Sequence, residues 1–156
     1  MKPAPFDYYR PATLGDAVSC LAPDSGRDDV KVLAGGQTLG PMLNLRLAQP
    51  GLLVDITRLA ELVGVGEEAD TIRLGGCITH AAIEDRRVPD VTQGFLPHVA
   101  AGIAYRAVRS RGTLGGSLAH ADPAADWLSA FRALAGELEI VSSRGSRREA
   151  IASFVT

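Results

Sequence analysis

The part of the chain that decides its fold reads Arg111-Gly112-Thr113-Leu114-Gly115-Gly116-Ser117-Leu118-Ala119-His120-Ala121-Asp122-Pro123-Ala124-Ala125-Asp126. This order of residues indicates a strand, a glycine loop and the start of a helix. Gly115 and Gly116 lack a Cβ atom, so we expect positive φ there and backbone N–H groups that approach a bulky anion. Asp122 and Pro123 suit the N-cap and the first position of the following helix. A helix N-terminus beside a glycine turn favours phosphate, because unpaired N–H groups and the helix dipole both attract negative charge.

A second glycine motif stands earlier in the chain and reads Leu33-Ala34-Gly35-Gly36-Gln37-Thr38-Leu39-Gly40-Pro41. A short β-branched strand over residues 30–34 leads into it, and Leu53-Val54-Asp55-Ile56 follows. Taken alone, this motif is explained equally well by a plain strand-to-helix turn and by a phosphate loop.

Both motifs, in this order, resemble those of the FAD-binding medium subunit of molybdenum hydroxylases, a family that includes carbon monoxide dehydrogenase and xanthine dehydrogenase. The resemblance runs from Phe6-Asp7-Tyr8 to Arg147 and Phe154. Family members continue well beyond that point, so the chain is expected to be incomplete at its C-terminus. Because the two loops occur together at the family's spacing, we interpret them as a shared pyrophosphate site rather than as two unrelated turns.

The resemblance implies an α+β fold in which two small lobes hold an extended FAD between them. Residues 1–60 would form the first lobe, with its pyrophosphate loop at 33–41. Residues 61–156 would form the second lobe, with its loop at 111–126. The mixture of strands and helices without strict βαβ alternation independently favours the α+β class.

Individual site residues follow from the same resemblance. The two loops would contact the diphosphate, Asp126 would accept a hydrogen bond from a ribitol hydroxyl, and His120 would occupy a flavin-facing position. Thr38 and Ser117 each add a hydroxyl group. The expected cofactor-binding residues are Ala34, Gly35, Gly36, Gln37, Thr38, Leu39, Thr113, Gly115, Gly116, Ser117, His120 and Asp126. No residue is expected to be catalytic by itself or to bind a metal, because the flavin carries the redox chemistry.

The implied function is electron transfer within a multi-subunit oxidoreductase. Electrons from a substrate oxidised at a molybdopterin-binding large subunit would pass through a [2Fe-2S] small subunit to FAD and on to an acceptor. One alternative is a flavoprotein like the enolpyruvyl-sugar reductase of wall synthesis, whose loop also reads Gly-Thr-x-Gly-Gly, although the segment 120–126 argues against it. An alternative of another class is a truncated, non-catalytic domain that packs against partner subunits without binding FAD tightly.

The composition is that of an ordinary globular protein, with 46% hydrophobic residues, 22% charged residues and a formal net charge of −2. This balance argues against an electrostatic nucleic-acid binder. No apolar run reaches the length of a transmembrane segment, and the N-terminus lacks the apolar region of a secretory signal, so a cytoplasmic location is expected. Cys20 and Cys77 form no paired spacing and are expected to be small buried residues rather than disulfide partners or metal ligands.

Local patterns predict most of the remaining elements. Thr13 and Asp16 form a capping-box pattern, and Thr79 is a second N-cap candidate. The other expected elements are a helix over 42–47, a strand over 52–55, a hairpin with arms 62–66 and 71–75, a helix over 96–107, a helix from 123 and a strand over 138–142 with an unpaired edge. His80 and His98 are interpreted as structural histidines.

Overall fold

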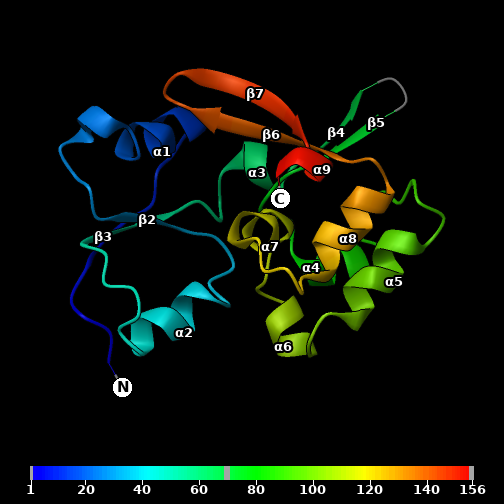
Figure 1. The fold of residues 1–156 in the computed structure, drawn as a ribbon, viewed down its shortest axis with the longest axis horizontal. Helices are drawn as coiled ribbons and strands as arrows, with labels where there is room; N and C mark the ends of the chain where they lie inside the picture. The colour runs from blue at the N-terminus through cyan, green and yellow to red at the C-terminus, as the bar shows by residue number, and fades with distance from the viewer. Residues whose placement is uncertain (1, 69–70, 155–156) are drawn as a thin grey trace.

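The computed structural model describes residues 2–68 and 71–154. Its elements, in chain order, are β1 (Asp7–Tyr9), α1 (Leu14–Cys20), η1 (Pro23–Ser25), β2 (Val30–Leu33), α2 (Leu39–Asn44), β3 (Leu52–Asp55), α3 (Ala60–Val63), β4 (Val65–Glu68), β5 (Thr71–Leu74), α4 (His80–Glu84), α5 (Phe95–Gly102), α6 (Arg106–Arg109), α7 (Leu114–His120), α8 (Asp126–Ala133), β6 (Glu137–Ser142), β7 (Gly145–Ala150) and α9 (Ile151–Phe154). The mixture confirms the α+β class (Figure 1).

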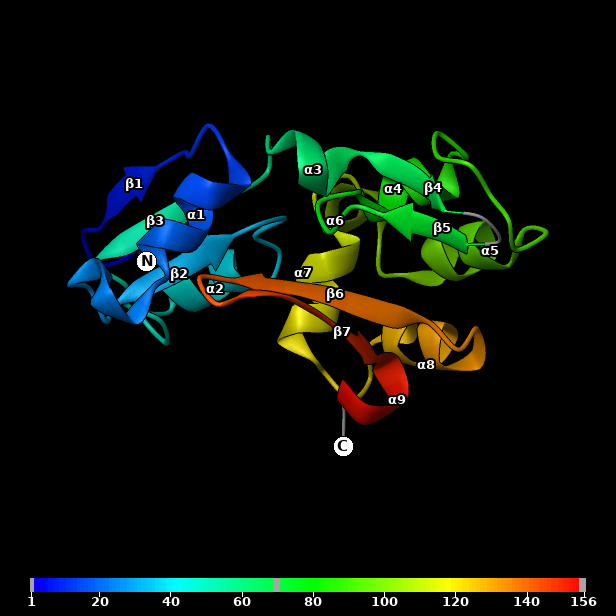
Figure 2. The same cartoon turned by 90° about the horizontal axis from the view of Figure 1, so that it is seen from above.

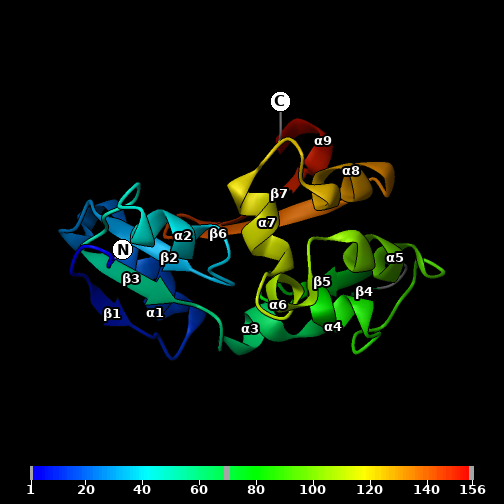
Figure 3. The ribbon, with the colours of Figure 1, turned by 90° about the horizontal axis from the view of Figure 1, so that it is seen from below.

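The N-terminal part is a parallel three-stranded sheet in the order β1-β3-β2. The central strand β3 is buried along its whole length, as expected for an apolar strand covered on both faces. Figures 1 and 3 show α1 and α2 on opposite faces of this sheet. A small core of Ala17, Leu52, Val54 and Leu59 lies beneath α1. The parallel order follows from the two helical crossovers.

The helix α1 begins as its sequence predicts. The Thr13 side chain accepts a hydrogen bond from the backbone N–H of Asp16, and the Asp16 side chain accepts one from the N–H of Thr13. This reciprocal capping box satisfies two N–H groups that the helix itself leaves unpaired.

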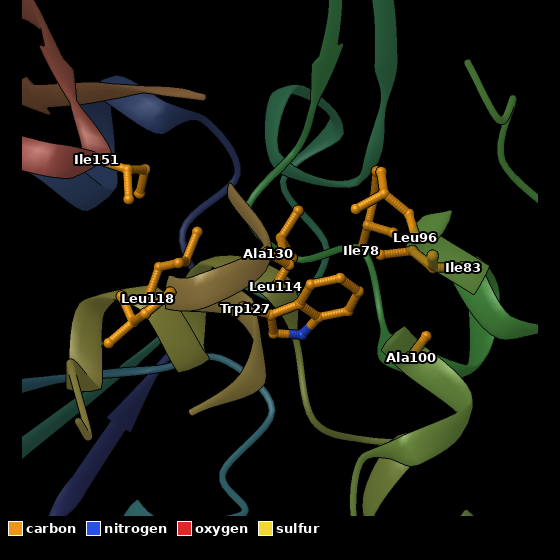
Figure 4. Close-up of a cluster of buried hydrophobic side chains, with 10 residues drawn as sticks. Ile78, Ile83, Leu96, Ala100, Leu114, Leu118, Trp127, Ala130 and Ile151 are labelled. Carbon is orange, nitrogen blue, oxygen red and sulfur yellow. The ribbon is translucent and has the colours of Figure 1, made fainter. Parts of the chain in front are cut away.

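The rest of the chain surrounds a larger core, in which Trp127 is fully buried. Figure 4 shows its indole ring between Leu114 on one side and the group of Ile78, Leu96 and Ile83 on the other. The buried members of this core come from α4, α5, α7, α8, α9 and the segment before α4, and they are Ile78, Ile83, Leu96, Ala100, Leu114, Leu118, Trp127, Leu128, Ala130 and Ile151. In Figure 3, α7 lies between the parallel sheet and the α5–α8 pair.

Two antiparallel hairpins, β4–β5 and β6–β7, complete the fold. The strand expected at 138–142 is β6, and β7, which is not expected from the sequence, pairs with one of its edges from Glu137↔Ala150 to Ser142↔Gly145. Among the described residues this sheet has two strands, so the other edge of β6 carries no strand. The residues of β7 are mostly exposed and half of them are charged, so a search for alternating apolar residues does not find this strand. Figures 1 and 2 show this ribbon extending past α7 toward the parallel sheet.

Three expected element boundaries are also wrong. The helix expected over 96–107 is two helices, because Ile103 is extended and Ala104 has φ +42°. The first helix after the sheet's glycine loop begins at Leu39 rather than at Met42. Leu62 and Val63 belong to α3, so only part of the first expected hairpin arm is a strand, and its tip at 69–70 lies outside the described residues.

Candidate functional site

The first glycine motif forms the turn between β2 and α2. Gly36 has φ +69°, a backbone conformation that L side chains rarely adopt. Among the described residues, the backbone N–H groups of residues 35–39 have no acceptor, and the Thr38 hydroxyl has no partner. The turn is closed instead by the N–H of Gly40, which donates to the Gly36 carbonyl at 2.8 Å. Five successive unpaired donors are therefore available at this turn.

The second glycine motif has a different local structure from the one expected. Gly115 and Gly116 lie in the first turn of α7, and neither has positive φ. Thr113 is the N-cap, and its hydroxyl accepts a hydrogen bond from the Gly116 N–H at 3.2 Å. The prediction of a positive-φ loop with free N–H groups is thus wrong here, because a threonine cap and neighbouring carbonyls already satisfy the helix start.

A short strap formed by residues 76–80 supplies these carbonyls. Leu114 N–H donates to Ile78 at 2.9 Å, Gly115 N–H donates to Gly76 at 2.8 Å, and an antiparallel bridge joins Thr79 to Thr113. Sequence reasoning missed this strap. The signal that could have found it is the pair Gly75-Gly76, because close packing of two backbones requires residues without side chains.

The structure brings the two glycine motifs into direct contact. A Cβ atom on Gly35 would lie 2.3 Å from the Arg111 carbonyl oxygen and 2.7 Å from the Gly112 Cα. A Cβ atom on Gly116 would lie 2.7 Å from the Thr113 hydroxyl and 3.6 Å from the Ala34 Cβ. Gly35 is therefore required because the backbones of the two motifs lie against each other, whereas Gly116 leaves room for the Thr113 hydroxyl of its own motif.

Gly115 has a packing role of its own. A Cβ atom there would come within 2.7 Å of the Gly76 Cα and 2.8 Å of the Gly76 carbonyl oxygen. With its N–H bonded to the same carbonyl, Gly115 fixes α7 against the strap. Gly115 therefore contributes close backbone packing to the site, and its N–H group is not free to bind a ligand.

The remaining expected site residues lie farther along α7 and at the start of α8. Ser117 is half-buried, and its hydroxyl has no partner among the described residues. His120 is exposed in the last turn of α7. Asp126 is exposed as the first residue of α8, and it lines a hollow of about 410 Å³ between α5 and α8. None of residues 34–39 or 113–120 is among the described residues that line this hollow.

The expected helix start at Pro123 is wrong. Asp122 and Pro123 belong to a turn in which the Ala124 N–H donates to the Asp122 carboxylate at 2.9 Å and the Ala125 N–H donates to the Asp122 carbonyl at 2.8 Å. The aspartate side chain thus stabilises the turn instead of capping a helix. Ala125 is the N-cap of α8, without a side-chain hydrogen bond.

Two buried polar side chains lie next to the motifs, because Asp55 pairs with Leu33 in the sheet and His80 packs on Gly112. Asp55, at the end of β3, accepts hydrogen bonds from Tyr8, Arg10 and Thr57. Burial alone would raise the pKa of Asp55, but the hydrogen bonds from Thr57, Tyr8 and Arg10 hold it well below its usual range. Asp55 therefore remains a carboxylate that ties β1 to β3, and it has no capacity for acid catalysis at neutral pH.

His80 is the second buried polar group. Its Nδ1 accepts a hydrogen bond from Trp127 Nε1 at 2.9 Å. Burial, assisted by the positive charge of Arg109, lowers the pKa of His80 to about 4. The side chain is neutral at pH 7, in agreement with a structural histidine.

Two of the arginines before the second motif form ion pairs with carboxylates of this chain. Arg106 contacts Asp85 at 2.6 Å, and Arg109 contacts Glu84 at 2.8 Å. Within the described residues, no three His, Cys, Asp or Glu side chains form a group that could hold a metal ion. Over residues 2–68 and 71–154, every helix is too short or too polar to cross a bilayer.

The model of the family described as "FAD binding domain in molybdopterin dehydrogenase" matches residues 4–156. The chain belongs to this family. FAD is accordingly the cofactor of this molybdopterin dehydrogenase domain. The two glycine motifs that meet in the structure are the two on which the resemblance was based.

Relatives in this family include the nicotine 6-hydroxylase medium subunit of Paenarthrobacter nicotinovorans, 41% identical over 94% of this chain and 51% of that protein. The xanthine dehydrogenase FAD-binding subunit of Escherichia coli O157:H7 is 34% identical over 96% of this chain and 50% of that protein. Among solved structures, carbon monoxide dehydrogenase from Hydrogenophaga pseudoflava matches with a TM-score of 0.91 at 34% identity, covering 100% of this chain and 54% of that one. The chain thus spans about half the length of the curated relatives it matches.

Proposed function

We propose that this chain is the diphosphate-binding part of a molybdenum hydroxylase flavin subunit. The observation that carries the proposal is the row of unpaired N–H groups at residues 35–39, held directly against the second glycine motif. Successive backbone N–H groups at a glycine turn are a recurrent anion site. The residues present therefore fit a diphosphate, since five donors face no internal acceptor and no side chain separates the two backbones.

In the proposed site, the twelve expected residues have different roles. Residues 35–39 donate backbone N–H groups, Ala34 connects β2 to this turn, and Thr38 and Ser117 add hydroxyl donors. Thr113, Gly115 and Gly116 shape the opposing wall. Asp126 accepts a hydrogen bond from a ribitol hydroxyl, and His120 stands near the flavin. In this proposal, residues 1–60 and 61–156 are the two lobes that enclose the cofactor.

When bound, FAD accepts electrons and passes them to an acceptor, and this chain's task is to hold and orient the cofactor. The proposed partners are a molybdopterin-binding large subunit and a [2Fe-2S] small subunit of a complex that works in the cytoplasm. Support comes from the relatives, which are named as the medium subunit of a nicotine 6-hydroxylase and the FAD-binding subunit of a xanthine dehydrogenase. The free cysteines Cys20 and Cys77 are consistent with a reducing compartment.

A titration of the chain with flavins of different length tests the diphosphate site. FAD is expected to bind, ADP is expected to compete with it, and riboflavin, which has no phosphate, is expected to bind about 100-fold more weakly. Flavin fluorescence follows the first and last titrations, and displacement of FAD follows the second. Equal affinity for riboflavin and FAD, or failure of ADP to compete, would contradict the site.

The variant Asp126→Ala is expected to weaken FAD binding by about 10- to 100-fold, since a hydrogen bond to a charged acceptor contributes about 1.5–3 kcal/mol. Its melting temperature should change little, because Asp126 is exposed and caps nothing. Asp122→Ala is the matched control, expected to leave FAD affinity unchanged. A large loss of melting temperature with unchanged FAD affinity would assign Asp126 to the fold instead.

A further inference from the structure

His80 lies where three separate elements meet. It is the first residue of α4 and is 5% exposed. Its backbone N–H donates to the Gly112 carbonyl at 3.0 Å, so its main chain is attached to the second glycine motif.

The imidazole ring makes two further contacts, one at each of two edges of the ring. A Cβ atom on Gly112 would lie 2.8 Å from both Cδ2 and Nε2 of His80, so this edge of the ring packs on the motif's backbone. At the other edge, Nδ1 accepts the indole N–H of Trp127. Trp127 is fully buried and directly follows Asp126 in α8. The ring therefore spans the space between the glycine motif and the helix that begins with Asp126.

We propose that His80 is a positioning residue whose ring, bonded to Trp127 and packed on Gly112, sets the separation between the second glycine motif and Asp126. The inference rests on the proposed function, in which the motif lies at the diphosphate and Asp126 at the ribitol. A single FAD molecule must contact the motif and Asp126 at the same time, so a shift of Asp126 relative to the motif weakens FAD binding. The bond also determines the ring's tautomer, with the proton on Nε2 while Nδ1 accepts.

Two variants separate the hydrogen bond from the volume of the side chain. His80→Leu fills the space but leaves the buried indole N–H without an acceptor, whereas His80→Asn retains an acceptor near the position of Nδ1. FAD affinity should fall about tenfold in His80→Leu and be substantially restored in His80→Asn. Trp127 is the chain's single tryptophan, so its emission spectrum reports on this site alone and should shift in His80→Leu but not in His80→Asn.

The test of positioning is a double-mutant cycle with Asp126→Ala. If His80 acts by placing Asp126, the variant His80→Leu/Asp126→Ala should bind FAD no more weakly than Asp126→Ala alone. ADP has no ribitol, and its affinity should be equal in His80→Leu and the wild-type chain. Circular dichroism and thermal melting identify the temperature at which all four proteins are folded.

The outcomes are distinct. Additive losses in the cycle, or equal losses for FAD and ADP, show that His80 supports only the general fold and overturn the inference while leaving the proposed function intact. A wild-type chain that binds neither FAD nor ADP overturns the proposed function and this inference with it. Should His80→Leu not fold, the same cycle is run with Trp127→Phe, which removes the bond from the donor side.

Discussion

Replacing Gly35 with alanine is expected to abolish measurable FAD binding and to lower the free energy of unfolding by about 2–3 kcal/mol. The added Cβ atom would lie 2.3 Å from the Arg111 carbonyl oxygen, 2.7 Å from the Gly112 Cα and 3.0 Å from the Arg111 carbonyl carbon. All three atoms are backbone, so no side-chain rotation relieves the overlap and the two motifs must move apart. The unpaired N–H groups of residues 35–39 would move away from the second motif with Gly35.

Gly40→Ala is the matched control for this prediction. Gly40 lies in α2, only five positions away, and a Cβ atom there would meet nothing within 4 Å. Alanine in a helix is about 0.5–1 kcal/mol more favourable than glycine, so this variant should be slightly more stable and should bind FAD normally. Urea unfolding and flavin titration of both variants check the pair. Normal FAD affinity in Gly35→Ala would show that the contact between the motifs is unnecessary for binding.

The second large effect is expected on acidification. The pKa of His80 falls from about 6.5 when unfolded to about 4 in the folded chain. Between these values the unfolded chain binds the proton more readily, so acid favours unfolding. The stabilisation is fully present above pH 6.5, falls through this window, and amounts to about 3 kcal/mol in total. Burial and the positive charge of Arg109 on α6 both disfavour the protonation of His80. The indole of Trp127, its hydrogen-bond partner, is neutral.

Measuring the free energy of unfolding from pH 5 to pH 7.5 avoids the titration of the carboxylates. Asp55, Glu84, Asp85 and Asp90 all have pKa values below their ordinary ones, so their contributions are lost only at lower pH. His80→Asn should remove most of the slope in the chosen window, because asparagine does not titrate. His98→Asn leaves His80 in place and should retain the slope. An unchanged slope in His80→Asn would refute the assignment.

Elements with strong local signals could be predicted from the sequence. The capping box at Thr13 and Asp16, the buried strand at Leu52–Asp55 and the Thr79 cap of α4 all occur where expected. In the two caps, residues three positions apart supply the decisive hydrogen bond, and the strand is marked by its own apolar run. Such interactions depend little on the rest of the fold.

The errors have a common physical cause: the structure of these segments is determined by contacts with residues that are distant in sequence. The pair Gly115-Gly116 is typical of a loop, because glycine is unfavourable in helices. Both glycines nevertheless lie in α7, where Gly115 lets the backbone of Gly76 approach the helix closely. The charged strand β7 is determined by its partner β6 rather than by its own composition. The roles of the individual site residues toward FAD stay predictions, although the contact between the two motifs is consistent with them.

The order in which these contacts can form has a consequence for synthesis on the ribosome. The parallel sheet needs only the residues up to Asp55, whereas the core around Trp127 includes Ile151, which is 2% exposed and donates its N–H to Gly136 at 3.0 Å. Chains are made from the N-terminus, and early segments fold first. The first glycine turn would therefore be displayed, with its N–H groups free, while its counterpart is still being translated. Cofactor capture by both motifs together then has to wait until the residues up to Ile151 have left the ribosome.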